Sequence, residues 1–114
     1  MQLDEVVHAA DVDLHVPALC DVEVAAAVRR ALARGLLTLE RAIDAVNDYL
    51  DLPLTRHGHA ALIGRVLEFR ENFSAYDATY VVLAERLDGS LLTGDRRLSR
   101  AVRSQTKVSI AGPQ

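Results

Sequence analysis

The sequence predicts one α/β domain in which a parallel sheet is covered on both faces by helices. Apolar residues repeat with helical spacing in several long segments, and short apolar runs separate those segments. Such alternation is typical of strand–helix–strand units, whose strands run parallel and are buried on both sides. A chain of 114 residues, half of them apolar, is long enough for one such core. We therefore interpret residues 1–114 as a single domain.

Start and stop signals place the elements in the first half of the chain. Pro17 fits the first turn of a helix, and Gly35 supplies a left-handed stop at its far end. Thr38 caps the next helix. The expected elements are a helix end at residues 6–10, a strand at 13–16, helices at 17–34 and 38–50, and a strand at 52–55.

The second half of the chain continues the same alternation. Ser74 is a capping residue, and Gly89 ends the helix that follows it. The expected elements are helices at residues 60–73 and 75–88, a strand at 90–93, a short helix at 96–103 and a last strand at 107–110.

Three acidic residues lie at junctions between these elements. Asp95 directly follows the strand at 90–93, whereas Glu23 and Asp77 lie in the first turns of helices. Ligands of open α/β sheets bind beyond the carboxyl ends of the strands, where these acids are expected to meet. Clustered carboxylates need protons or a cation, and oxygen ligands suit Mg²⁺ or Mn²⁺. Each acid taken singly also has a structural explanation. Glu23 can be an exposed helical charge, Asp77 a charge near a helix N-terminus, and Asp95 a helix cap.

Three stretches carry a resemblance to a known family: residues 16–25 (VPALCDVEVA), 72–78 (NFSAYDA) and 91–95 (LLTGD). In this order they resemble PIN-domain nucleases, most closely the VapC toxins of bacterial toxin–antitoxin pairs. The resemblance covers nearly the whole chain. It implies a PIN-like three-layer fold and metal-dependent endoribonuclease activity on RNA phosphodiesters. It also implies Glu23, Asp77 and Asp95 as catalytic and metal-binding residues, Mg²⁺ or Mn²⁺ as cofactor, and a VapB-like antitoxin as partner.

The N-terminus departs from the family pattern. Such toxins begin with a strand that ends in a metal-binding Asp, and here residues 1–5 lead straight into what resembles a later helix. We therefore expect the first, central strand to be missing, and Asp4 lacks the preceding β-branched run of a replacement. The sheet must then rearrange, pair with another chain or rely on a partner. An alternative function is a catalytically impaired module that binds the antitoxin or itself, and this chain alone is expected to be nearly inactive.

Supporting roles are predicted for residues that flank the acids. Ser74 is expected to cap its helix and support the site, Thr93 to orient water or a carboxylate, and Asn72 to contact substrate. Arg96 and Arg97 are candidates for binding phosphate. Strand propensity explains Thr93, and an ordinary charged helix face explains the arginines equally well.

Other polar residues are interpreted as structural. His57 and His59 are only two residues apart and have no third ligand nearby in the sequence, so a zinc site is not predicted. Tyr76 and Tyr80 are expected to pack at the edge of the core, and Asp21 to be a helix N-terminal charge rather than a further ligand.

Composition narrows the class of protein. The net charge of −3 excludes a globally basic nucleic-acid-binding domain, so any RNA contact must be local. The chain has no apolar run of membrane-spanning length and no signal-peptide pattern, so a cytoplasmic protein is expected. Cys20 is the only cysteine, and its apolar neighbours predict a buried thiol. The apolar helices at residues 22–32 and 62–69 favour a homodimer.

Overall fold

The computed structural model describes residues 5–8 and 14–111, and within these ranges it shows an α/β fold built on a five-stranded mixed sheet. The predicted fold class is confirmed. The strands are β1 (Glu5–His8), β2 (Leu14–Pro17), β3 (Leu54–His57), β4 (Ser90–Thr93) and β5 (Ser109–Ala111). The helices are α1 (Leu19–Ala33), α2 (Leu39–Leu50), the 3₁₀ turn η1 (Ala60–Leu62), α3 (Ile63–Glu68), α4 (Ala75–Arg86) and α5 (Arg96–Gln105).

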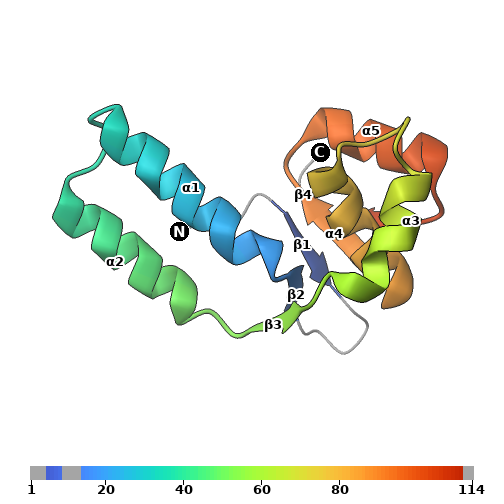
Figure 1. Ribbon diagram of the computed structural model, residues 1–114, viewed down its shortest axis with the longest axis horizontal. Coiled ribbons are helices and arrows are strands. Elements are labelled where there is room, and N and C mark those ends of the chain that lie inside the picture. Colours follow the sequence, from blue (N-terminus) through green and yellow to red (C-terminus); the bar gives the residue numbers. More distant parts are fainter. Residues whose placement is uncertain (1–4, 9–13, 112–114) are drawn as a thin grey trace.

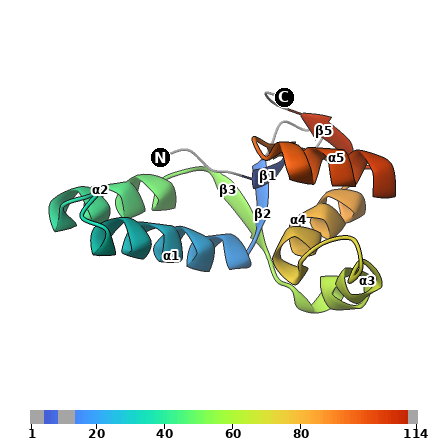
Figure 2. The ribbon, with the colours of Figure 1, turned by 90° about the horizontal axis from the view of Figure 1, so that it is seen from above.

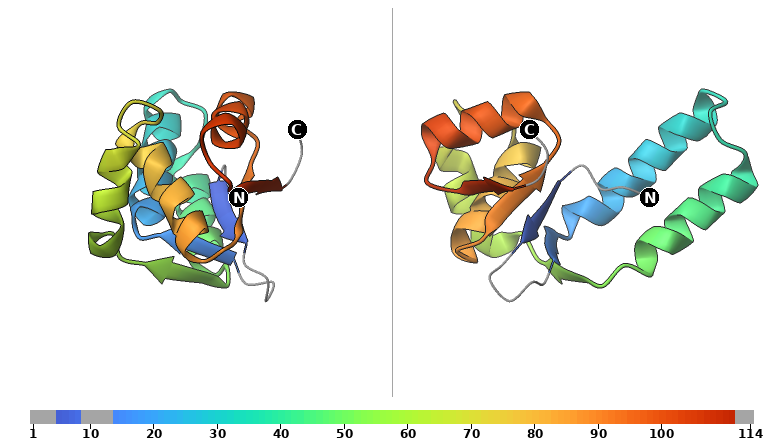
Figure 3. Two further views of the ribbon diagram at one scale, coloured as in Figure 1. Left: turned by 90° about the vertical axis from the view of Figure 1, so that its right-hand side faces the viewer. Right: turned by 180° about the vertical axis from the view of Figure 1, so that it is seen from behind.

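The sheet has the order β3-β2-β1-β4-β5, with β1 at its centre. β2 pairs with β3 and β4 pairs with β5 in parallel, but β1 runs antiparallel to both of its neighbours. The expectation of an all-parallel sheet is therefore wrong. In Figure 3, β1 (blue) lies between the α1–α2 pair and the C-terminal part of the molecule.

The segment before β2 is the strand β1, so the prediction of a helix end at residues 6–10 is wrong for residues 6–8. Residues 9 and 10, and Asp4, lie outside the described residues. Val6 and Val7 are both buried, as in a strand covered on both faces, and two adjacent β-branched residues favour extended backbone. Of the three ways left open for closing the sheet, the structure shows rearrangement. A segment of this chain occupies the centre that was expected to be empty.

Helix α4 forms the middle of the core. Every residue from Ala78 to Ala84 is buried, so this helix has no solvent-facing stripe over two turns. It packs on β1, β2 and β4 with one side and on α3 with another, whereas α5 packs on β4 and β5 (Figure 2). This central position fixes the start of α4 relative to the strand ends.

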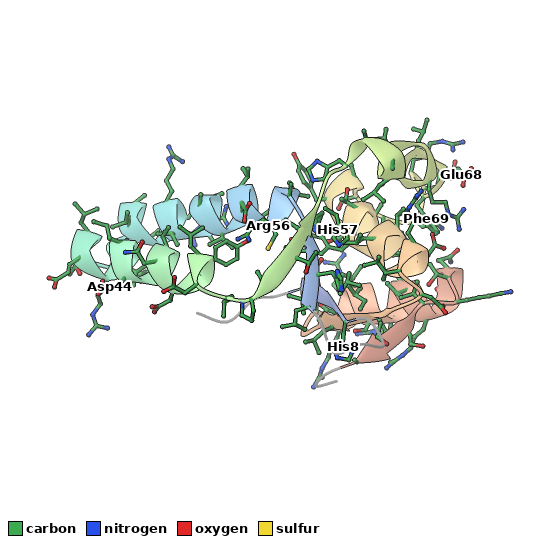
Figure 4. All side chains as sticks on the ribbon, turned by 90° about the horizontal axis from the view of Figure 1, so that it is seen from below. His8, Asp44, Arg56, His57, Glu68 and Phe69 are labelled. Carbon is green, nitrogen blue, oxygen red and sulfur yellow. The ribbon has the colours of Figure 1, made fainter. Side chains whose placement is uncertain are left out.

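Helices α1 and α2 form a hairpin that projects to one side of the sheet (Figure 1). The predicted signals at its tip are confirmed: Gly35 has a φ of +71°, and the Thr38 hydroxyl accepts a hydrogen bond from the Arg41 N–H at 3.2 Å. Its base is fixed by Asp21, which accepts hydrogen bonds from the Tyr49 hydroxyl at 2.6 Å and from Arg56 Nε at 2.9 Å. Figure 4 shows Arg56 on the hairpin side of β3.

The helix expected at residues 60–73 is shorter in the structure. It begins as η1, continues as α3 and ends at Glu68, after which a turn leads to α4. Phe69 and Phe73 are both buried in that turn, with their rings edge to face at 5.3 Å between centroids. Burial of the two rings holds the turn that delivers the chain to Ser74. No helix within the described ranges has the length and apolar character needed to cross a membrane.

Candidate active site

The candidate site lies at one edge of the sheet, where β2 and β4 end. Helix α1 starts two residues after β2, and α5 starts after Asp95 at the end of the β4 connection. Because β1 is antiparallel, its first residue, Glu5, pairs with Thr93 at the carboxyl end of β4. The start of β1 is therefore brought to the edge that carries the predicted acids.

Backbone capping holds Asp77 and Asp95. The Ser74 hydroxyl accepts a hydrogen bond from the Asp77 N–H at 3.0 Å, which confirms Ser74 as the cap of α4. Asp95 Oδ1 accepts hydrogen bonds from the Arg97 and Leu98 N–H groups at 2.9 and 3.2 Å, and so caps α5. Buried Thr93 accepts a hydrogen bond through Oγ1 from the Asp95 N–H at 3.0 Å. The predicted capping role of Ser74 is thus confirmed, whereas the supporting roles of Ser74 and Thr93 in the site stay predictions.

Glu23 is held by a tyrosine whose role the sequence did not predict. The Tyr80 hydroxyl donates a 2.6 Å hydrogen bond to Glu23 Oε1, joining α1 to α4. Burial of Tyr80 and this bond to a carboxylate both raise the pKa of the phenol. Tyr80 is buried as expected, whereas Tyr76 is exposed and does not pack at the edge of the core.

Glu5 is the acidic residue that the sequence analysis missed. Burial, the negative charges of Asp77, Glu23 and Asp95, and a side-chain hydrogen bond with Asp77 together raise the pKa of its carboxyl group to about 8. Its Oε2 atom is buried and has no hydrogen-bond partner. The only signal in the sequence was an acid directly before two valines. All three predicted acids raise the pKa of Glu5, so their carboxyl groups lie in one electrostatic environment.

A cavity of about 340 Å³ opens beside this environment. Asp77, Asp95 and Arg97 line it, together with Asn72, Phe73, Ser74, Leu98 and Ala101. Asn72 donates a hydrogen bond to Gln105 Oε1 at 3.1 Å, so its side chain also ties the cavity wall to α5. Arg96 is exposed and is not among the lining residues. Of the two predicted arginines, only Arg97 is placed at the cavity.

Several polar residues have structural partners elsewhere. Asp21 binds Tyr49 and Arg56 at the base of the hairpin, which agrees with its interpretation as a structural charge. His59 Nε2 accepts a hydrogen bond from the Leu19 N–H at 2.8 Å, and His57 lies 2.9 Å from His15, measured between ring nitrogens. Cys20 is a buried free thiol, as predicted.

The polar atoms at the edge of the sheet are carboxylate oxygens, the type of donor that hard divalent cations prefer. One of these oxygens, Glu5 Oε2, is buried without a partner. As they stand, no three His, Cys, Asp or Glu side chains within residues 5–8 and 14–111 form a group that could hold an ion. Binding would therefore require the carboxylates to draw closer together, and a cation would supply the attraction that offsets their repulsion.

Replacing Tyr80 by phenylalanine is expected to weaken Mn²⁺ binding by roughly tenfold, because partners that orient a ligand typically contribute this much to metal affinity. Calorimetric titration of both proteins measures the difference. Tyr49→Phe is the matched control, since it removes an equally short bond to a carboxylate at the hairpin base. Equal affinities for Tyr80→Phe and the parent protein would contradict a positioning role for Tyr80.

The fold and its acidic edge define a PIN-like α/β domain. No family model matches the chain. VapC ribonuclease Mb0985 of Mycobacterium bovis is 40% identical over 97 residues, which cover 85% of this chain and 76% of that protein. Ribonucleases VapC3 and VapC1 of Mycobacterium tuberculosis are 39% and 42% identical over 88 and 86 residues, covering 77% and 75% of this chain and 64% and 65% of theirs. The chain belongs to the VapC ribonuclease family.

Proposed function

We propose that this protein is the toxin of a VapBC-type toxin–antitoxin pair and a metal-dependent endoribonuclease that hydrolyses RNA phosphodiesters. Family membership supports the ribonuclease activity. The observation that carries the metal-dependent mechanism is the shared environment of Glu23, Asp77 and Asp95, which come from three separate helical starts at one sheet edge.

In this mechanism the carboxylates would hold Mg²⁺ or Mn²⁺, which supplies a water of lowered pKa and neutralises charge on the scissile phosphate. The residues of the chain prepare that arrangement. Tyr80 orients Glu23, and the bond from Asp95 N–H to Thr93 holds the Asp95 backbone against β4. Arg97 lines the cavity beside the acids, where its guanidinium would bind an RNA phosphate.

We propose a VapB-like antitoxin and a second copy of this chain as protein partners, and the cytoplasm as location. Exposed apolar side chains support partner binding. On the hairpin they are Val22, Leu36, Leu39, Ile43 and Leu50, and on α3 and α4 they are Ile63, Leu67 and Tyr76. Surfaces of this kind are typical of protein–protein contacts.

The test is cleavage of a structured RNA in the presence of Mg²⁺ or Mn²⁺. Because β1 occupies the sheet centre that was expected to be empty, we expect cleavage in place of the near-inactivity predicted from the sequence. A chelator should abolish this cleavage and added metal should restore it, because the acids alone cannot neutralise the phosphate. Cleavage that persists in excess chelator would contradict the metal-dependent mechanism. A folded protein that binds a VapB-like antitoxin but leaves RNA intact at all metal concentrations would instead support the alternative of a catalytically impaired binding module.

A further inference from the structure

We propose that helix α5 binds the phosphate backbone of single-stranded RNA through a stripe of three exposed arginines outside the cavity. The arginine stripe consists of Arg96, Arg100 and Arg103, all of them exposed. This inference rests on the proposed function, because it extends the binding of the same RNA from the cavity onto the outer surface of the protein.

Helical spacing places the arginine stripe on one side of α5. Its members follow one another at intervals of four and three residues, so they share a face over about 10 Å of the helix. The opposite side of α5 is buried, through Leu98, Ser99 and Val102. Arg97 lines the cavity beside Asp77, so the positive charges continue from the cavity onto the outer face. In Figure 2, α5 lies at the opposite end of the molecule from the hairpin tip.

The charge of α5 differs from that of the rest of the chain. Helix α5 contains four arginines and no acid, a charge of +4, whereas the rest of the chain has nine basic and sixteen acidic residues, a charge of −7. Each of α1 to α4 contains acidic residues, as an ordinary solvated helix face does. A local positive field on an acidic protein attracts a polyanion to that face alone.

The arginines of α5 are placed where they do not stabilise the helix. Arg96 and Arg100 are four residues apart, and Arg100 and Arg103 are three apart, so their like charges repel. Arg96 and Arg97 lie in the first turn, at the positive end of the helix dipole. Within residues 5–8 and 14–111 no acid forms an ion pair with an α5 arginine, whereas the ion pairs of β3 and α3 neutralise theirs. A bound polyanion would relieve this repulsion, and guanidinium groups bind phosphate through two hydrogen bonds.

The surroundings of the stripe favour RNA over an acidic protein. Protein–protein contacts combine charged groups with a centre of apolar and aromatic side chains. In the part of the chain that the structure describes, the large exposed apolar side chains lie on the hairpin, α3 and α4, and none lies on α5. The exposed neighbours of the stripe on α5 are polar, namely Ser104 and Gln105. A charged, polar face of this kind suits a phosphate backbone.

The first experiment measures binding of a short single-stranded RNA by fluorescence anisotropy, in excess chelator to stop the proposed cleavage. For single strands, each phosphate contact adds about −0.7 to the slope of log affinity against log salt. Replacing all three stripe arginines by glutamine should therefore flatten the slope by about 2. The affinity advantage of the parent should then shrink roughly 20-fold between 50 and 200 mM salt. RNAs of different sequence should lose affinity equally, because phosphates carry no sequence information.

A matched control removes the same charge from another place. It replaces by glutamine three exposed arginines near the tip of the hairpin: Arg29, Arg30 and Arg34. Its salt slope should be that of the parent, and an equal flattening in both triple variants would overturn the proposal. The single variant Arg100→Gln should flatten the slope by about 0.7 and tests the stripe with one exposed substitution. Circular dichroism and melting temperature check that each variant is folded.

The second experiment is steady-state cleavage of the same RNA with Mg²⁺. The stripe variant should raise KM and leave kcat near the parent value, because contacts outside the cavity hold substrate and transition state alike. An unchanged salt slope and KM would overturn the stripe and leave the proposed function standing. Unchanged RNA affinity with lost affinity for a VapB-like antitoxin would assign the stripe to a protein partner instead. Stripe-dependent RNA binding without cleavage at any metal concentration would overturn the proposed function and support the stripe.

Discussion

Asp77→Asn is expected to lower metal-dependent RNA cleavage by about 100-fold or more, because it removes a charged ligand oxygen from the site. Asp77 is part of the cavity wall and raises the pKa of Glu5 through its charge. Loss of that charge relieves repulsion among the acids, so the melting temperature should hold or rise. Single-turnover cleavage at saturating Mg²⁺ and thermal denaturation measure the two effects.

Asp44→Asn is the matched control for this change. Asp44 is exposed on α2, in the projecting hairpin, as Figure 4 shows. It should cleave RNA at the parent rate and melt at the parent temperature. Undiminished cleavage by Asp77→Asn would remove Asp77 from the catalytic residues, and a large fall in its melting temperature would assign it a structural role instead.

Gly89→Ala is expected to destabilise the protein by about 1–3 kcal/mol, the usual cost of inserting atoms into packed structure. A Cβ atom at Gly89 would lie 2.6 Å from the backbone oxygen of His8 and 3.3 Å from Val7 Cγ1. Backbone at the end of β1 would have to move away from β4. For a domain of this size such a cost lowers the melting temperature by roughly 4–8 °C per kcal/mol.

Gly64→Ala separates crowding from the general effect of replacing glycine. A Cβ atom at Gly64 meets nothing within 4 Å, and Gly64 lies inside α3, where alanine has the higher helix propensity. This variant should be as stable as the parent or more so. If Gly89→Ala were equally well tolerated, the antiparallel placement of β1 beside Gly89 would be wrong.

Local signals explain why most helices could be predicted from the sequence. Thr38, Ser74 and Asp95 each cap the helix that follows them, and Gly35 ends α1 in the left-handed conformation. These features depend on neighbours three or four residues away, which a sequence displays directly. The strand beginning at residue 54 differs from the predicted start at 52 because Pro53 cannot donate to a ladder.

The centre of the sheet could not be predicted in the same way. Residues 6–10 carry no strong helix stop or cap. Whether they form a strand depends on whether the sheet has a free position beside β2 and β4, and that is set by the tertiary structure. The same dependence on tertiary structure concealed the positions of Glu5, which pairs with Thr93, and of Tyr80, which binds Glu23, because each pair is more than fifty residues apart in sequence. The roles of Glu23, Asp77 and Asp95 stay predictions, although their helical starts lie where the alternation of elements placed them.

The hydrogen bond between Tyr80 and Glu23 links the projecting α1–α2 hairpin to helix α4 in the core. Helix α1 has 15 residues and is about 22 Å long, with Glu23 near its inner end. The exposed apolar residues of the hairpin lie on α1, on α2 and on the turn between them. A partner that bound the hairpin and tilted it would displace the Glu23 carboxylate relative to Tyr80, whose helix α4 is buried in the core. If the acids hold a cation as proposed, binding of a partner at the hairpin and binding of the cation would then be coupled, with the same strength in both directions.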